Sequence, residues 1–392
     1  MQPVEAIAFE PSLYEALQQT LTKKGPVQAV EALCATLREK KDYAKLFYAM
    51  LMKKRVQMGV SPIPTASASG FSESQQTEYE DAIREACRTT GELFLKERNI
   101  PAAFAYYRMI GELNPVKEAI EQFQPGPEED IQPVVDVAFS QGVHPKKGFD
   151  LILERYGICS AITTASGYDP GHGPEVRAYC VRQLVRSLHE QLIERLRSVI
   201  EQQQGFAPSG RTIPTLIDGR DWLFADDMYL TDTSHLSSVV QMSLDLQDPE
   251  DLRLARELCA YGKKLSPTLQ YQGTPPFEKI YEDIDVYLSI ILGDDVEAGL
   301  KHFRDKITAN LEEGPDQFAA EVLVRLLVRL DRLPEALEVG KQYLTDVDER
   351  QLSCPGTFDL AQRLKDYQSL AESARVRQDP VHYLAGLIAA SK

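Results

Sequence analysis

The sequence lacks the features of membrane and secreted proteins. Its 392 residues contain no window that approaches about 18 uninterrupted apolar residues, the length that marks a membrane-spanning helix. The segment from Met1 to Glu10 has neither the positive charges nor the apolar run of a secretory signal. These absences predict a cytoplasmic protein with no membrane partner.

Cysteine is scarce and widely spaced. The six cysteines form no C-x-x-C pair, whereas disulfide and zinc frameworks need close, paired spacing. Most of them stand beside apolar residues in segments with helical periodicity, so we expect reduced, buried thiols.

Complete catalytic motifs are also absent. The sequence has no G-x-S-x-G nucleophile elbow and no G-K-[ST] phosphate loop. His189-Glu190 does not extend to an H-E-x-x-H zinc motif, because Ile193 stands where the second histidine belongs. An enzyme is therefore the less favoured class.

Positive charge is in deficit. Lys and Arg number 43 and Asp and Glu 59, which gives a net charge of −16 at pH 7. Such a charge repels nucleic-acid phosphates unless a strong basic patch offsets it. The clusters Lys53-Lys54-Arg55 and Lys146-Lys147 are too short to form one. We expect no nucleic-acid partner, and an acidic field that favours basic protein partners.

Helical periodicity, in contrast, is abundant. Apolar residues recur at three- and four-residue steps through most of the chain, and strand-like alternation is scarce. The longest expected helix spans 175–203. The Pro- and Ser-rich stretch 61–74 is expected to be an exposed loop or linker, and the small, hydroxylated stretch 157–173 a structured loop. The pattern predicts an all-α fold.

The segment 84–117 carries a repeat pattern around the turn Glu97-Arg98-Asn99. Small and aromatic residues stand at the offsets of a 34-residue helix–turn–helix repeat, namely Gly91, Phe94, Ala103, Tyr107 and Pro115. Two further turns, 331–333 and 365–367, place Leu333 and Tyr367 at the same period of 34 residues. Such repeats bury their apolar faces only by stacking on one another.

On these residues the chain resembles tetratricopeptide-repeat proteins. The resemblance is carried best by 84–117, less by 317–350, where Val324 and Gly340 depart from the family pattern, and weakly by 27–60 and 351–384. It implies stacked helical hairpins wound into an α–α superhelix, and a closed α/α toroid is the alternative. We expect three parts: N-terminal hairpins at 1–125, a central segment without the pattern at 126–275, and C-terminal hairpins at 276–392.

The central part holds the densest polar cluster of the chain. It comprises Asp218, Asp221, Trp222, Asp226, Asp227, Tyr229, Asp232 and His235. Carboxylates and an imidazole on one irregular segment can bind a hard divalent cation or act as acid and base. The alternative is structural, because Asp232-Thr233-Ser234 can cap the helix that follows and the other carboxylates can be solvated.

A second candidate is the segment 168–173, which ends in Gly171-His172-Gly173 just before the long helix. Glycines beside a helix N-terminus can admit an anion to the free backbone N–H groups. The alternative is a tight turn on which His172 faces solvent.

Two functional classes follow from these patterns. The favoured one is a binding module or scaffold that recognises a protein or peptide, with Tyr107, Trp222 and Tyr229 as candidate groove aromatics. The alternative is a metal-binding or hydrolytic enzyme whose site is formed by the loops 157–173 and 217–235. Its candidate residues are His172, Asp221, Asp226, Asp227, Asp232 and His235. No cofactor is expected for the binding module. The enzyme alternative would use a divalent cation.

Overall fold

Every regular element in the described residues is helical. The computed structural model describes residues 9–63, 71–167, 173–309 and 314–391, and in these ranges it has no β-strand, only a single β-bridge between Gln272 and Lys279. The predicted all-α class is confirmed. Within the same ranges, no helix is long and apolar enough to cross a membrane.

The chain divides into two compact units, Met1–Arg155 and Tyr156–Lys392. The elements of unit 1 are α1 (Pro11–Lys24), α2 (Pro26–Glu39), α3 (Tyr43–Gln57), α4 (Glu73–Lys96), α5 (Ile100–Ile110), α6 (Asn114–Glu121), α7 (Gln132–Val135), the π-helical turn η1 (Asp136–Ser140) and the first part of α8 (Pro145–Ser166). The boundaries predicted at 125/126 and 275/276 stay a prediction.

Unit 2 contains the long helix and the C-terminal hairpins. Its elements are α9 (Pro174–Gln204), α10 (Ile213–Ile217), η3 (Asp221–Asp227), α11 (Thr233–Met242), η4 (Ser243–Asp245), α12 (Pro249–Lys264), η5 (Pro267–Leu269), α13 (Ile280–Leu292), α14 (Val296–Ile307), α15 (Gln317–Arg329), α16 (Leu333–Tyr343), η6 (Glu349–Gln351), α17 (Thr357–Leu364), α18 (Tyr367–Val376) and α19 (Pro380–Ala390).

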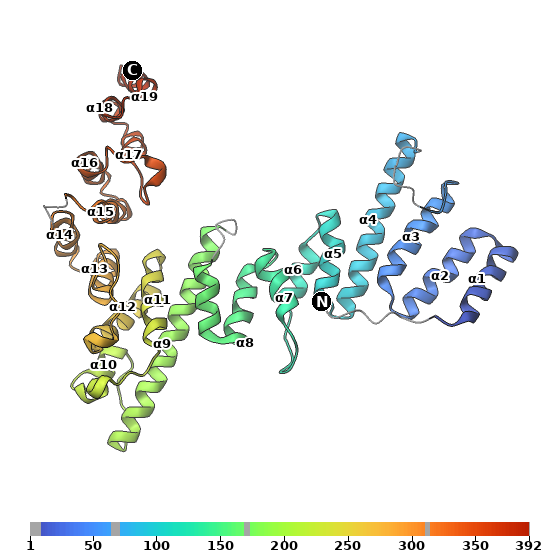
Figure 1. The fold of residues 1–392 in the computed structure, drawn as a ribbon, viewed down its shortest axis with the longest axis horizontal. Coiled ribbons are helices and arrows are strands. Elements are labelled where there is room, and N and C mark those ends of the chain that lie inside the picture. Colours follow the sequence, from blue (N-terminus) through green and yellow to red (C-terminus); the bar gives the residue numbers. More distant parts are fainter. Residues whose placement is uncertain (1–8, 64–70, 168–172, 310–313, 392) are drawn as a thin grey trace. The chain divides into compact units, whose positions relative to one another are not determined.

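Helices that follow one another in the chain pack against one another. This holds from α1 to α5 in unit 1 and from α12 to α19 in unit 2, and Figure 1 shows the helices lying side by side in chain order. Such packing buries the apolar stripe of each helix against its neighbours. Helix α9, predicted at 175–203, is found at Pro174–Gln204, and it packs on α10, α11 and α12.

One kind of turn recurs between the paired helices. A residue in the left-handed conformation is followed directly by the N-cap residue of the next helix, as in Arg98 (φ 58) and Asn99. The backbone N–H of Asn99 donates to the carbonyl of Phe94, 2.9 Å away, which closes the end of α4. The same arrangement occurs at Lys41/Asp42, Asp331/Arg332, Lys365/Asp366 and Gln378/Asp379. The turns predicted at 97–99, 331–333 and 365–367 are therefore present.

Close contact between a glycine and an aromatic ring joins helices in both units. A Cβ atom added to Gly91 in α4 would lie 2.5 Å from the ring of Tyr107 in α5, and one added to Gly262 in α12 would lie 2.4 Å from the ring of Tyr281 in α13. Both rings are 2% exposed. Only glycine leaves the helix surface open enough for this approach.

The prediction of a loop at 157–173 is wrong for its first ten residues, which belong to helix α8. Gly157 is non-helical (φ 77), but α8 continues beyond it to Ser166. The hydroxyls that suggested a loop donate to carbonyls four residues back, for example Thr164 to Ser160 at 2.9 Å, and so are satisfied inside a helix. Ala161 and Ala165, one helical turn apart, are buried.

Candidate functional site

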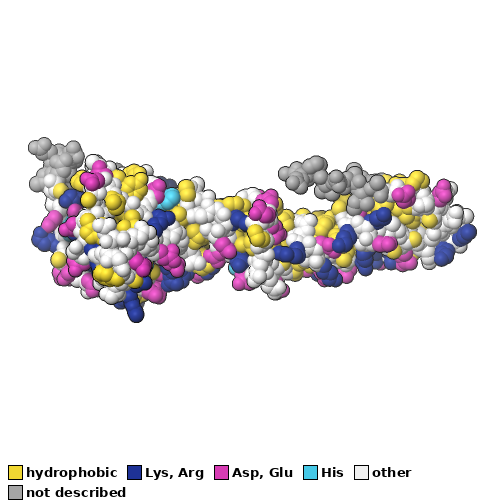
Figure 2. Space-filling model, turned by 90° about the horizontal axis from the view of Figure 1, so that it is seen from below, with side chains coloured by type: hydrophobic (Ala, Val, Ile, Leu, Met, Phe, Trp, Pro, Cys, Tyr) yellow, Lys and Arg dark blue, Asp and Glu magenta, His cyan; other side chains and the backbone are white. Residues whose placement is uncertain are grey.

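The first helix of unit 1 has an apolar face that the described residues leave exposed. Helix α1, which is described in full, has no buried residue, although Leu13, Leu17 and Leu21 follow one another at four-residue steps along it. Tyr14 on α1 and Tyr48 on α3 are 64% and 68% exposed. Apolar side chains also reach the surface over these N-terminal helices at the right of Figure 2.

These side chains line a groove between α1, α2 and α3. Its deeper part has a volume of about 610 Å³ and is lined by Leu13, Leu17 and Tyr48, and also by Tyr79 of α4. A shallower part of about 360 Å³ continues along α1 to Leu21. The two parts share Leu17, together with Leu33, Met52 and Pro62, so they form one surface. We call it the N-terminal groove.

Arg55 lies in the wall of the N-terminal groove with only 9% of its surface exposed. Its Nε donates to the carbonyl of Ser61 at 2.6 Å, and its Nη2 approaches the carbonyl of Ile63 at 3.4 Å. The guanidinium stands 5.2 Å and 5.5 Å from the ring centres of Phe71 and Tyr79. Carbonyl dipoles and aromatic faces thus hold a buried positive charge.

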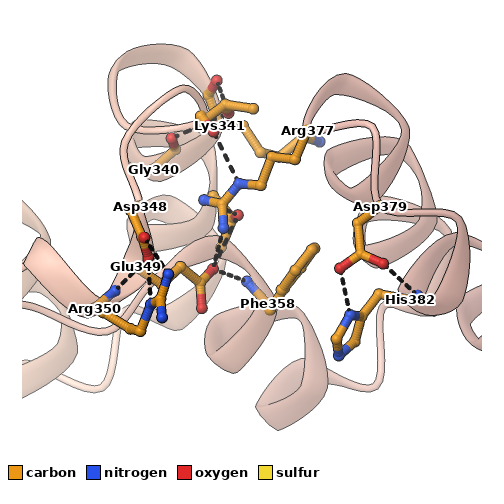
Figure 3. A network of polar contacts seen from close by, with 11 residues as sticks. Gly340, Lys341, Asp348, Glu349, Arg350, Phe358, Arg377, Asp379 and His382 are labelled. Atoms are coloured by element: carbon orange, nitrogen blue, oxygen red, sulfur yellow. Dashed lines mark hydrogen bonds and ion pairs between the residues drawn. The ribbon is translucent and has the colours of Figure 1, made fainter.

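Unit 2 has a hollow at its C-terminal end that is lined mainly by charged rather than apolar side chains. Its volume is about 800 Å³, and it is lined by charged residues of the α16–α17 connection and by the start of α19. Figure 3 shows the ring of Phe358 between the side chains of Arg377 and His382. The guanidinium of Arg377 lies 4.9 Å from the centre of this ring, and the imidazole stacks on it at 5.1 Å. We call it the C-terminal cleft.

Most charged side chains of the C-terminal cleft are paired within it. Arg377 lies 3.1 Å from Glu349, and Arg350 lies 2.7 Å from Asp348. Asp379 accepts from the backbone N–H of His382 and lies 2.6 Å from its Nδ1, and these hydrogen bonds lower the pKa of the Asp379 carboxyl. Most charged groups of the cleft therefore already have partners inside it.

The acidic residues predicted as a site in the central part have separate partners. Asp232 is the N-cap of α11 and accepts from the amides of Ser234 and His235, and the hydrogen bond from the Ser234 hydroxyl is the main cause of its lowered pKa. Asp221 pairs with Lys264 at 3.2 Å and is 87% exposed. Asp232 thus caps α11, which is the role that the structural alternative gives it.

The remaining members of that set do not meet around one point. Asp227 accepts from the hydroxyl of Thr268 at 3.3 Å, while Asp226 is exposed and has a left-handed backbone. Within the described ranges, no group of three His, Cys, Asp or Glu side chains could hold a metal ion. His172 lies outside the described residues.

The candidate groove aromatics have three different environments. Tyr107 is buried against Gly91 and so fills the contact between α4 and α5, which contradicts a groove position for it. Trp222 is half-buried in η3, and Tyr229 is 53% exposed beyond it.

Sequence reasoning missed the residues that line both hollows. The signal for the N-terminal groove was the leucine stripe of α1 with Tyr14 beside it, which resembles any core-facing helix. The signal for the C-terminal cleft was Asp379 three residues before His382, a spacing that also serves as an ordinary N-cap.

Comparison with protein-family models, with curated proteins and with solved structures finds no match to this chain. Its class is therefore defined by the fold, an all-α protein of helices packed in neighbouring pairs.

Proposed function

We propose that this chain is a tetratricopeptide-like binding module whose N-terminal groove binds an amphipathic helix of a partner protein. The observation that carries the proposal is the uncovered apolar face of α1, which lines a groove already formed by α1, α2 and α3. Large contiguous apolar surfaces on soluble proteins mark interaction sites. The recurrent turns and the Gly91–Tyr107 contact support the repeat assignment.

The lining of the groove favours a helical ligand over an extended one. Its walls are mostly side chains of helices, chiefly leucine and tyrosine. An extended peptide would bring unpaired backbone N–H and C=O groups into this apolar surface, each at a cost of about 1–3 kcal/mol. A helix satisfies its own backbone groups and presents apolar side chains at i, i+3, i+4 and i+7.

The segment that forms most of the groove differs in charge from the chain as a whole. Residues 9–63 contain nine Lys and Arg (Lys23, Lys24, Arg38, Lys40, Lys41, Lys45, Lys53, Lys54, Arg55) against five Asp and Glu (Glu10, Glu15, Glu31, Glu39, Asp42). Residues 9–63, which include α1, α2 and α3, are thus locally basic in a chain of net charge −16. Their field attracts acidic partners rather than basic ones.

Selection from a displayed library of peptides of about 20 residues, roughly 30 Å long as helices, tests the proposal with the full chain as bait. We expect enriched peptides with apolar residues at helical spacing. A Tyr48→Glu variant places a charge on the groove wall, so it should weaken their binding at least about tenfold, or 1.4 kcal/mol. Because Tyr48 is 68% exposed, the fold should be unaffected.

Met109→Glu is the matched control. Met109 is 62% exposed on α5 and does not line the groove, so the same change there should leave binding unchanged. Selection that yields only peptides equally sensitive to both variants, or no peptide at all, would contradict the proposed function.

A further inference from the structure

Arg55 has an incomplete set of partners for a buried arginine. A guanidinium carries five N–H donors. Among the described residues, the hydrogen bonds of Arg55 use only Nε and Nη2, both toward backbone carbonyls. No described carboxylate lies within ion-pair distance of it. Buried charges are normally paired, because removal from water is costly without a counter-charge.

Lys45, the other cation in the wall, is already neutralised. Its Nζ lies 2.5 Å from Asp42 and 5.0 Å from the ring centre of Phe9. Its neighbours on α3, Lys53 and Lys54, are paired with Glu31 and Glu78. Arg55 therefore differs from the other cations near it, since they have carboxylate partners within unit 1.

The groove itself supplies no counter-charge to Arg55. Among the described residues that line its two parts there is no Asp or Glu, and the lining is otherwise mainly apolar. A ligand that fills this surface would exclude water from the guanidinium. That would strengthen its interaction with any carboxylate that the ligand brings and would penalise a ligand that brings none.

We infer that Arg55 binds a carboxylate of the partner, so that the partner helix carries an Asp or Glu within its apolar face. This inference rests on the proposed function and names the chemistry of the ligand. The planar guanidinium matches a carboxylate with two parallel hydrogen bonds. A doubly charged phosphate is the poorer fit, because the second cation of the wall, Lys45, is held by Asp42.

The test repeats the peptide selection with Arg55→Met, Arg55→Lys and Lys45→Met variants of the full chain. Against the unaltered chain, we expect one position between the apolar positions to be enriched in Asp or Glu. With Arg55→Met this enrichment should disappear while the apolar pattern persists. Arg55→Lys keeps the charge and should retain the acidic preference, weakened because a lysine cannot form the bidentate pair.

Binding measurements with individual peptides then give the coupling energy between Arg55 and the acidic residue of the peptide. Replacing the enriched Glu by Gln in the peptide should weaken binding to the unaltered chain about tenfold or more and should have little effect on binding to Arg55→Met. The same replacement should weaken binding to Lys45→Met as strongly as to the unaltered chain. Thermal unfolding of each variant separates loss of the carboxylate contact from damage to the 61–63 segment that Arg55 also holds.

The outcomes of this inference and of the proposed function are distinguishable. Enrichment of the apolar pattern without an acidic position, or an acidic position that persists in Arg55→Met, overturns the role of Arg55 and leaves the groove as a docking site. Failure to obtain any peptide that depends on Tyr48 overturns both.

Discussion

The N-terminal groove and the C-terminal cleft are built from the same kind of helical hairpin. They differ in whether their side chains have partners within the chain. The hairpins of both regions use the turn in which a left-handed residue precedes the N-cap, at Lys41/Asp42 in one and Gln378/Asp379 in the other. The groove exposes leucine and tyrosine to water, whereas the cleft pairs Asp348 and Glu349 with its own arginines.

This difference indicates where binding energy is available. Covering exposed apolar surface yields about 25 cal/mol for each Å² removed from water, so a ligand gains by filling the groove. A ligand in the cleft would have to replace ion pairs and hydrogen bonds that already exist, which returns little net energy. Both sites thus have the same type of hairpin backbone. Their exposed side chains determine whether a site can bind a ligand or contributes to the stability of the fold.

The largest effect should come from overpacking the glycine–aromatic contacts that both units share. In Gly262→Val the new side chain would overlap the ring of Tyr281, which is 2% exposed and cannot move aside. We expect a loss of about 3 kcal/mol in the free energy of unfolding, at the upper end of typical overpacking. Gly91→Val should destabilise unit 1 in the same way through Tyr107.

Urea denaturation and hydrogen exchange resolved along the chain measure these losses. Exchange should accelerate mainly in α12 and α13 for Gly262→Val and mainly in α4 and α5 for Gly91→Val. Gly126→Ala is the control, because its nearest neighbours lie 3.8 Å and farther from the added Cβ. A Gly262→Val protein as stable as the Gly126→Ala protein would show that the close contact is not a packing constraint.

The elements that the sequence predicted well are those decided by local chemistry. The predicted bounds of the long helix, 175–203, agree within one residue at each end with those of α9, where Pro174 begins the helix and Gly205 follows its last residue. The turn at 97–99 was found from residues within a few positions of one another.

The elements that escaped prediction depend on the partners that helices find in space. Whether the leucines of α1 face a core or a groove is decided by what packs on them, and the sequence of α1 is the same in both cases. The sequence indicates Arg55 only as part of a basic cluster. Its aromatic neighbours Phe71 and Tyr79 are distant from it in the sequence, so their contact with Arg55 is not evident there. The small, hydroxylated composition of 158–166 favours a loop, whereas the spacing of the buried Ala161 and Ala165 fits the helix that the structure has.

A smaller effect is expected from the cleft, and on stability alone. Arg377 is 16% exposed at its side chain, pairs with Glu349 and donates from Nε to the carbonyl of Thr345 at 2.9 Å. Arg377→Met removes these bonds and leaves Glu349 without its cationic partner, so we expect a loss of about 1–3 kcal/mol in unfolding free energy. Urea denaturation measures it.

The same variant sharpens the contrast between the two hollows. Arg377→Met should bind the selected peptides as tightly as the unaltered chain, while Tyr48→Glu should lose binding and keep its stability. Reduced peptide affinity in Arg377→Met, measured at a temperature where the variant is fully folded, would assign binding to the cleft. It would contradict the view that only the groove binds peptides.

The smallest effect should be the pH dependence that the cleft confers. Hydrogen bonds from the side chain and the amide of Arg350 lower the pKa of the Asp348 carboxyl from 3.8 to about 2. Because the folded pKa lies below the unfolded value, the contribution is complete above about pH 4 and is lost as the pH falls toward 2. The urea midpoint of the unaltered chain should therefore fall more steeply over this window than that of Asp348→Asn. Since Arg350 is 89% exposed, added salt should reduce the difference, whereas a difference that is insensitive to salt would show that the charge pair is not its source.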